Sequence, residues 1–260
     1  MDYLLPTHII IIKKMSKKNK ITIISDLHLG LNNSKPKNIL NFLNSIETEV
    51  LILNGDIIDI DAINRGHKWK NKHNKVIIKL LDMSKKTKVV YIRGNHDDDI
   101  KKLFNTKIGN IEFVDEFHVY VEDGENEKKY VVTHGDKLEN PNNKLKIFYK
   151  VGSVLYDVLL SINNYYNIIR EFFKLPYHSI SKMAKTNVKK IMSFIFEFEV
   201  KAFEFAIKTN SDGIICGHIH TPTIKKIGDI EYMNSGDWVE NQTAIVLDSN
   251  NHWALVDLSL

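Results

Sequence analysis

The sequence predicts a mixed α/β fold built around a largely parallel β-sheet. Five short runs of apolar residues are near-continuous, as in strands that are buried on both faces. They span residues 21–30, 50–59, 88–98, 129–136 and 213–220. Segments of helical periodicity separate the first three runs, and a β-α-β-α-β order favours parallel strands with helices outside the sheet.

Each of these two helical segments has one apolar face. The first covers residues 36–47 and begins at Pro36, a favourable first position for a helix. Its apolar face consists of Ile39, Phe42, Leu43 and Ile46. The second covers residues 74–84, and its apolar face consists of Val76, Ile77, Leu80 and Leu81. One apolar face on each helix is what packing against a sheet requires.

The pattern changes after the third strand. Residues 111–122 and 129–135 have the character of strands with short connections, which predicts a more antiparallel section. Apolar residues then recur at three- and four-residue spacing over about 140–210, with a break at Pro176. We expect a helical hairpin there, inserted between two strands of the main sheet, before strands resume at 230–248.

The composition is that of an ordinary folded protein. Hydrophobic residues make up 43% and charged residues 26% of the 260, and the net charge is +4. The positive charge is almost all lysine, scattered among asparagines, so no nucleic-acid partner is expected. The single cysteine, Cys216, excludes an intrachain disulfide and fits a reducing, cytoplasmic environment.

The N-terminal residues differ from the rest of the chain. The short apolar run at 8–12 lacks the cationic start and cleavage site of a signal peptide, and no run approaches the ~20 residues that span a membrane. Met15 opens a stretch that would be a sensible protein start by itself. We expect a flexible tail at 1–20, in which residues 1–14 are tail or an over-extended start, before a single domain at 21–260.

Residue types that bind metals follow every one of the five predicted strands. In chain order they are Asp26, His28, Asp56, Asn95, His96, Asp97, His134, His218 and His220. In open α/β sheets, sites form beyond the carboxyl ends of the strands, so these segments point to one rim. Each motif alone is more often turn or cap chemistry, but five such motifs at five strand ends favour a metal site.

Glycines adjoin nearly all of these motifs, and they are Gly30, Gly55, Gly94, Gly135 and Gly217. Glycine allows the sharp turns and close backbone approaches that a crowded ion site requires.

The ordered set DLH, GDIID, GNHD, HGD and GHIH resembles the calcineurin-like metallophosphoesterase superfamily, and the match covers residues 21–248. Within it, SDLHLG, NGDIID and NSGDWVENQTAIV are most similar to the branch related to UDP-2,3-diacylglucosamine pyrophosphatase. The resemblance implies a metallophosphoesterase fold, a four-layer α-β-β-α sandwich with an inserted helical cap.

The resemblance also implies a site for two divalent ions. One ion would be held by Asp26, His28 and His220, and the other by Asn95, His134 and His218. Asp56 would bridge the two. Mixed carboxylate, imidazole and amide ligands suit Mn²⁺, which we expect, or Fe or Zn. Two ions about 3.5–4 Å apart would clamp a phosphate and lower the pKa of a bridging water, and the resulting hydroxide would attack phosphorus in line.

Two further residues have implied catalytic roles. His96 would contact the phosphate together with Asn95 and protonate the leaving oxygen, without being a metal ligand. Asp97 would orient an imidazole. The enzymes best known to cleave the lipid A precursor carry Arg in place of His96, and an aromatic residue and Glu where this chain has DIID, ending in Asp59. This departure leaves the predicted class of chemistry unchanged. It weakens the prediction of a lipid substrate.

Candidate substrate contacts lie outside the five motifs. Part of the predicted insertion would line an acyl-chain pocket, or pack entirely against the core and the partner helix. A cationic rim for a diphosphate would be formed by Lys182, Lys185 and Lys189, which could equally be a solvated helix face. Trp69 would contact a nucleotide or sugar, or serve only in packing.

Three functional hypotheses follow. The first is a two-metal hydrolase that cleaves the pyrophosphate of a nucleotide-linked lipid, peripherally bound at the inner face of the cell membrane. The second is a two-metal phosphomonoesterase or phosphodiesterase for a soluble nucleotide or other phosphate ester. The third, a non-catalytic scaffold, predicts eroded ligands, and here every ligand position is filled. No specific protein partner is expected.

Overall fold

The computed structural model of this chain describes residues 18–103, 105–139 and 181–258, apart from the side chains of 98–101 and 181–190. The chain divides into a larger unit, which comprises residues up to Lys137 and from Ala202 onward, and a smaller unit from Leu138 to Lys201. The first strand begins at Asn19, two residues before the predicted start of the domain, and residues 1–17 of the predicted tail lie outside the described residues.

A seven-stranded sheet forms one half of the larger unit, with the strand order β12-β11-β1-β2-β3-β5-β4. The strands are β1 (Asn19–Ile24), β2 (Thr48–Asn54), β3 (Lys88–Ile92), β4 (Thr106–Ile108), β5 (Ile111–Val114), β11 (Thr243–Leu247) and β12 (Trp253–Asp257). β1, β2, β3 and β5 run parallel, and antiparallel strands flank them on both sides. The predicted parallel centre, with helices between its strands, is therefore confirmed.

A five-stranded sheet forms the other half, in the order β6-β7-β8-β10-β9. Its strands are β6 (Phe117–Asp123), β7 (Asn126–Val132), β8 (Gly213–Cys216), β9 (Thr223–Ile227) and β10 (Ile230–Asn234). β7 and β8, which flank the predicted helical insertion, are parallel neighbours here. The prediction that the insertion interrupts the main sheet is therefore wrong, because apolar periodicity reveals that a strand is buried but not which strands it pairs with.

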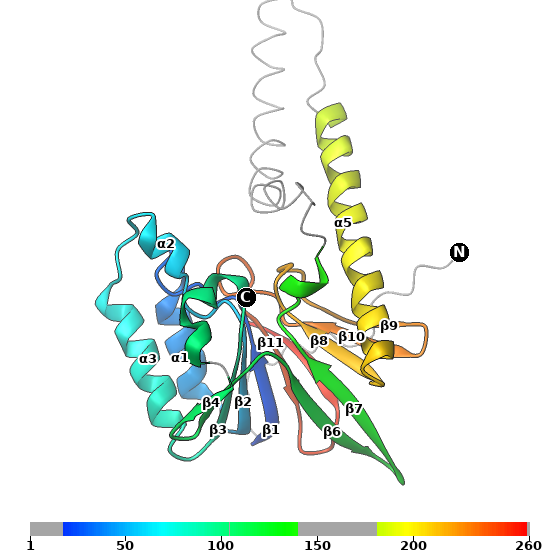
Figure 1. Ribbon diagram of the computed structural model, residues 1–260, viewed down its shortest axis with the longest axis horizontal. Coiled ribbons are helices and arrows are strands. Elements are labelled where there is room, and N and C mark those ends of the chain that lie inside the picture. Colours follow the sequence, from blue (N-terminus) through cyan, green and yellow to red (C-terminus); the bar gives the residue numbers. More distant parts are fainter. Residues whose placement is uncertain (1–17, 104, 140–180, 259–260) are drawn as a thin grey trace, which may run out of the picture. The chain divides into compact units, whose positions relative to one another are not determined.

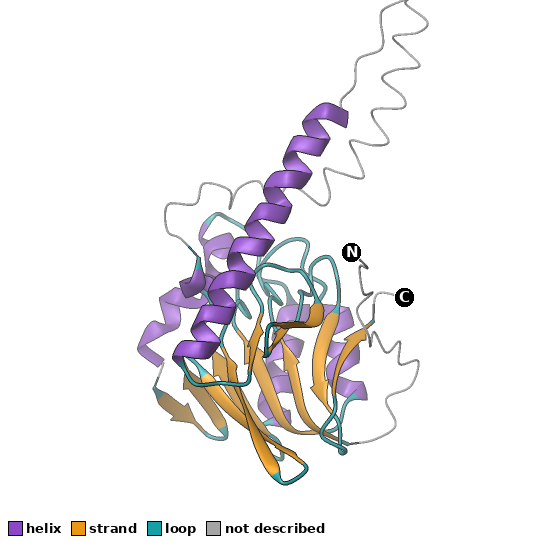
Figure 2. Cartoon of the chain, turned by 90° about the vertical axis from the view of Figure 1, so that its right-hand side faces the viewer, coloured by secondary structure: helices purple, strands orange, loops and turns teal. Residues whose placement is uncertain are grey.

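The helices lie outside the two sheets (Figures 1 and 2). They are α1 (Pro36–Ser45), α2 (Ile60–Asn64), α3 (Asn71–Met83) and α5 (Ser181–Lys208), with 3₁₀ helices η1 (Asn95–Leu103) and η2 (Asp136–Leu138). α1 and α3 cover the outer face of the seven-stranded sheet. The C-terminal turns of α5 bury Ala202 and Ala206, and Phe203 lies beside Gly228 in the β9–β10 turn of the other sheet. None of the described helices is long and apolar enough to cross a membrane.

Alternating side chains of the central strands divide the core in two. On β2, Leu51 and Leu53 face the helices, while Ile52 faces the second sheet. Val90 and Ile92 of β3 join Ile52 between the sheets, where strands of both sheets contribute buried residues. This alternation follows from the two-residue period of a strand. The layers are thus helix, sheet, sheet and helix, as the predicted fold class requires.

Stability depends on the core between the sheets. Ile52 is fully buried there, so Ile52→Ala should lower the free energy of unfolding by about 2–5 kcal/mol, measured by urea denaturation. Ile78 on α3 is 64% exposed, and Ile78→Ala should change the same quantity by less than about 0.5 kcal/mol. Equal effects of the two substitutions would contradict the assigned core.

Candidate metal centre

The site forms where loops from both sheets meet. The loops after β1, β2 and β3 come from the seven-stranded sheet, and those after β7 and β8 come from the five-stranded sheet. The single-sheet rim expected from the sequence is therefore a rim shared by two sheets. Three groups of three side chains have ligand atoms that all lie within 4.8 Å of one another. They are Asp26–His28–His220, Asp56–His134–His218 and His28–Asp56–His96.

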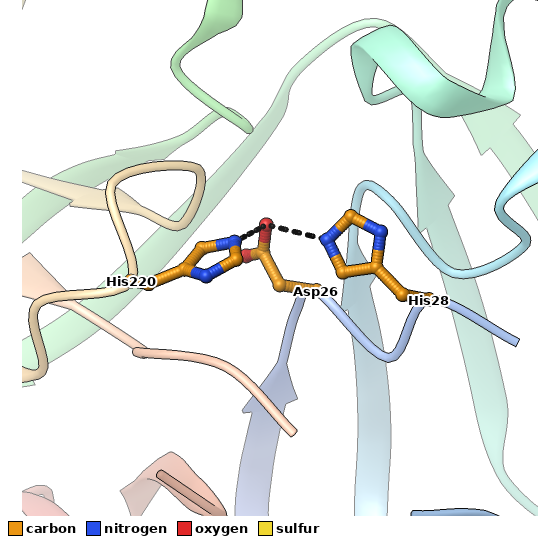
Figure 3. Close-up of side chains that lie close together, drawn as sticks. All are labelled: Asp26, His28 and His220. Carbon is orange, nitrogen blue, oxygen red and sulfur yellow. Dashed lines mark hydrogen bonds and ion pairs between the residues drawn. The ribbon is translucent and has the colours of Figure 1, made fainter. Parts of the chain in front are cut away.

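The first group is centred on Asp26, which lies between two imidazoles (Figure 3). Its Oδ1 lies 3.1 Å from Nε2 of His220 and 3.9 Å from Nε2 of His28. Its Oδ2 accepts a hydrogen bond of 3.0 Å from the backbone N–H of His218. The loop after β8 is thus bound directly to the loop after β1.

The second and third groups share Asp56. Oδ2 of Asp56 lies 3.5 Å from Nε2 of His134 and 3.8 Å from Nε2 of both His28 and His96. The ring of His218 lies edge-on to that of His134, with the centroids 5.0 Å apart. One carboxylate therefore faces imidazoles from both predicted ion sites, which is the position that a bridging ligand needs.

The backbone at five candidate ligands is in the left-handed region. The φ angles are 53° at Asp26, 44° at His28, 55° at Asp56, 66° at His218 and 51° at His220. Positive φ is uncommon outside glycine and is costly for residues with a Cβ. It persists only where the surroundings enforce it, and it concentrates at functional sites. Five of the residues that the sequence motifs single out therefore carry backbone strain.

Asp59, rather than Asp97, holds the imidazoles in place. Its Oδ2 lies 3.0 Å from Nδ1 of His28, its Oδ1 lies 3.2 Å from Nδ1 of His96, and Oδ1 also caps α2 by accepting from the N–H of Ala62 at 2.7 Å. Fixing Nδ1 in this way directs Nε2 of each ring into the cluster. Nδ1 of His134 is held similarly, by a 2.8 Å hydrogen bond to a backbone carbonyl.

The prediction that Asp97 orients an imidazole is wrong. Its carboxylate is fully buried and accepts hydrogen bonds from backbone N–H groups and from the hydroxyl of Tyr91. The position of Asp97 in the sequence suggested that it lies beside an imidazole ring. In the structure, the tight turn that begins η1 directs its side chain toward the loop after β2. The sequence signal that could have identified Asp59 is its place three residues after Asp56 at the start of a short helix.

Opposite charges compensate one another throughout the cluster. Burial opposes ionisation of Asp26, but the facing His220 and His134 lower its pKa to about 2. Burial also opposes protonation of His134 and His220. Asp56 and Asp26 nevertheless raise the pKa of His134 to about 10. The pKa of His220 is raised to about 9, mainly by Asp26. Burial raises the pKa of Asp97, with help from Asp56, to about 7. So dense a set of buried carboxylates demands positive charge, which divalent ions supply.

Several buried atoms fit a metal ion better than any protein partner. Nε2 of His28, Nε2 of His134 and Oδ1 of Asn95 are buried, and among the described residues none of them makes a hydrogen bond. Buried polar atoms are normally satisfied, so such a set calls for an explanation. Imidazole nitrogen, carboxylate and amide oxygen are ordinary ligands of divalent ions. The cluster therefore fits a divalent metal centre.

Comparison with known proteins agrees with this chemistry. The family described as calcineurin-like phosphoesterase matches residues 19–222, most of the chain. The chain belongs to this family. This calcineurin-like phosphoesterase is accordingly a metal-dependent phosphohydrolase, and the predicted superfamily and fold class are confirmed.

Several solved structures of low sequence identity match this phosphoesterase along most of its length. An archaeal phosphodiesterase is 17% identical with a TM-score of 0.42, over 92% of this chain and 99% of its own. YfcE, a phosphoesterase from E. coli, is 17% identical with a TM-score of 0.44, over 92% and 99%. Vacuolar protein sorting 29 from Cryptosporidium parvum is 13% identical with a TM-score of 0.41, over 92% and 97%. No curated protein matches the chain.

The predicted nucleotide or sugar contact lies in a packing environment. Trp69 packs against the helix-side core, donates a hydrogen bond to Asn74 and contacts the ring of His73, so it takes part in the packing of α3. That placement favours the packing alternative over a nucleotide contact. The side chains of the predicted cationic rim lie outside the described residues, and they are Lys182, Lys185 and Lys189.

Two glycines lie against the carboxylates of the candidate site because no larger residue fits. A Cβ at Gly94 would lie 2.2 Å from Oδ1 of Asp56, and one at Gly217 would lie 2.6 Å from Oδ2 of Asp26. Gly217→Ala should therefore displace Asp26 and weaken Mn²⁺ binding about 10-fold or more, measured by isothermal titration calorimetry.

The matched control is Gly109→Ala, where a Cβ would meet nothing within 4 Å. Because φ is +59° at Gly109, this substitution should cost about 1 kcal/mol of stability and leave Mn²⁺ affinity unchanged. Unchanged Mn²⁺ affinity in Gly217→Ala would count against Asp26 as a ligand.

Proposed function

We propose that this phosphoesterase cleaves the pyrophosphate bond of a nucleotide-diphosphate lipid similar to UDP-2,3-diacylglucosamine, with two divalent ions, Mn²⁺ in the first instance. The observation that supports two ions is the Asp56 carboxylate, which faces His28 of one triad and His134 of the other. Asp26, His28 and His220 would hold one ion, and Asn95, His134 and His218 the other. Bound there, the ions supply Lewis-acid activation of the phosphate and of a water.

The side chains around the centre position and protonate the substrate. His96 is 12% exposed, whereas the carboxylate of Asp56 beneath it is 3% exposed, so His96 lies at the mouth of the cluster. Its Nδ1 is held by Asp59 at 3.2 Å, with Asp61 at 3.7 Å. When the ring carries both protons, Asp59 accepts from Nδ1–H and Nε2–H can donate a proton to the leaving oxygen. Asn95 and His96 together would contact the phosphate oxygens.

The lipid part of the proposal has two supports. The first is the resemblance of SDLHLG, NGDIID and NSGDWVENQTAIV to the lipid-cleaving branch. The second is a line of exposed apolar side chains on α5 within the smaller unit, where Met192, Phe196 and Val200 are 60%, 68% and 37% exposed. They recur every four residues and so share one helix face, which suits contact with acyl chains or a membrane surface. The proposal accordingly places the enzyme in the cytoplasm, at the inner face of the membrane.

A soluble phosphomonoester or phosphodiester is the second candidate. His96 favours it, since the enzymes best known to cleave the lipid A precursor carry Arg at this position. A protonated histidine serves any phosphate ester whose leaving oxygen needs a proton, and does not itself select a lipid.

A substrate panel separates the two candidates. With Mn²⁺ present, the purified protein should release UMP from UDP-2,3-diacylglucosamine faster than it hydrolyses bis(p-nitrophenyl) phosphate at equal concentration. Asp56→Asn should abolish both activities, while Asp82→Asn, an exposed carboxylate on α3, should abolish neither. Turnover of the diester without turnover of the lipid would reject the first candidate in favour of the second. Activity retained in Asp56→Asn would reject the two-metal mechanism.

His96 can be tested through the leaving group. His96→Gln removes the proton donor, so kcat for a substrate with a poor leaving group should fall about 10²–10⁴-fold. For a p-nitrophenyl ester, whose leaving group needs little protonation, the fall should be much smaller. Stopped assays with alkyl and p-nitrophenyl esters measure the difference. Equal losses for both substrates would show that His96 binds phosphate without acting as an acid.

A further inference from the structure

A buried carboxylate links the two loops that carry Asp56 and Asn95. Oδ1 of Asp97 accepts a 3.1 Å hydrogen bond from the N–H of Ile58, and Oδ2 lies 3.4 Å from the N–H of Ile57. Both N–H groups belong to the loop after β2. Oδ2 also accepts from the N–H of Gly94, in the turn after β3, at 3.3 Å. The side chain is fully buried, so these contacts are shielded from water.

The link runs in both directions. While Asp97 accepts from the loop after β2, Oδ1 of Asp56 accepts a 2.8 Å hydrogen bond from the N–H of His96 in the turn after β3. Each loop thus supplies a carboxylate that binds the other loop's backbone. Ile57 and Ile58 directly follow Asp56, whose φ of 55° needs support from its surroundings. Asp97 provides that support at the two next N–H groups.

Tyr91 anchors this link in the core. Its hydroxyl donates a 2.8 Å hydrogen bond to Oδ1 of Asp97, from β3, three residues before Gly94. The side chain is 6% exposed, and its ring stacks on Phe113 with the centroids 5.2 Å apart. The position of the carboxylate is therefore set by a buried strand and an aromatic pair. Tyr91 lies outside all five sequence motifs.

We propose that Tyr91 and Asp97 are positioning residues. They hold Asp56 and Asn95 at the separation at which both can bind the second ion while Asp56 also binds the first. This inference rests on the two-metal function proposed above. Neither side chain touches the reacting atoms, so their effect is exerted through the ligands. Partners that orient metal ligands typically change metal affinity or activity about 10–100-fold when removed.

Tyr91→Phe tests the proposal because it removes only the hydroxyl. The dissociation constant of the more weakly bound Mn²⁺ should rise about 10-fold by isothermal titration calorimetry. The electron paramagnetic resonance signal of the coupled Mn²⁺ pair should weaken at subsaturating metal. With saturating Mn²⁺, kcat should fall while KM stays unchanged, because the substrate contacts remain. Asp97→Asn should show the same pattern more strongly, since an amide cannot accept on both sides.

Tyr130→Phe is the matched control. Tyr130 is also buried, and its hydroxyl also donates to a carboxylate, Glu231 at 2.9 Å, but in the five-stranded sheet away from the two loops. It should lose comparable stability in urea denaturation and retain wild-type Mn²⁺ affinity and kcat. Equal Mn²⁺ affinities in the two variants would overturn the proposal, whatever their stabilities.

The metal readout separates this inference from the proposed function. If the wild-type protein binds two Mn²⁺ ions but hydrolyses no phosphate ester, the proposed function fails, and the affinity comparison still decides the role of Tyr91. If the wild-type protein hydrolyses esters and Tyr91→Phe matches Tyr130→Phe, only the positioning role fails.

Discussion

The buried carboxylate of Asp56 is the constraint on which the rest of the site depends. It is 3% exposed and faces His134, His28 and His96 within 3.8 Å. An isolated buried charge of this kind is very unfavourable, so it must be compensated by cations or by hydrogen bonds from fixed donors. The strained φ of Asp56, the close approach of Gly94 and the buried link through Asp97 can each be understood as a consequence of holding this one group in place.

The two-sheet architecture follows from the same requirement. Loops from a second sheet bring imidazoles to the carboxylate from a direction that the first sheet does not cover. Here β7 and β8 bring His134 and His218 from the second sheet, opposite Asp26, Asp56 and Asn95 from the first. Packing between Ile52, Val90 and the inward residues of the other sheet sets the distance between the two sets. Close-packed interiors tolerate little displacement, so the core between the sheets fixes the geometry of the site as well as the stability of the unit.

Local patterns account for what could be predicted from the sequence. Continuous apolar runs located the strands, and the polar residues that end them located the clustered side chains, because strand ends in parallel sheets converge.

The features that could not be predicted from the sequence depend on contacts between distant segments. Nothing in residues 129–136 or 213–220 shows that β7 pairs with β8 in a second sheet. The orienting role was assigned to Asp97, and Asp59 was given none, because spacing along the chain does not reveal which way a side chain points out of a turn. Tyr91 was missed since a tyrosine in a buried strand has the pattern of an ordinary core residue.

Residues outside the metal centre must select the substrate. Asp26, His28, Asp56 and His134 are buried, whereas His96 and His220 are 12% and 23% exposed. In the proposed mechanism His96 contacts the phosphate, which every ester substrate shares, so this contact does not select among them. Asp61, whose side chain is 56% exposed and lies 3.7 Å from the ring of His96, adds negative charge at the mouth and so opposes substrates with further anionic groups nearby. A diphosphate substrate must offset that repulsion, and in the lipid hypothesis the compensating free energy comes from burial of acyl chains. A soluble monoester would have no such compensation, so the charge at the mouth itself weighs against the most anionic of the soluble substrates.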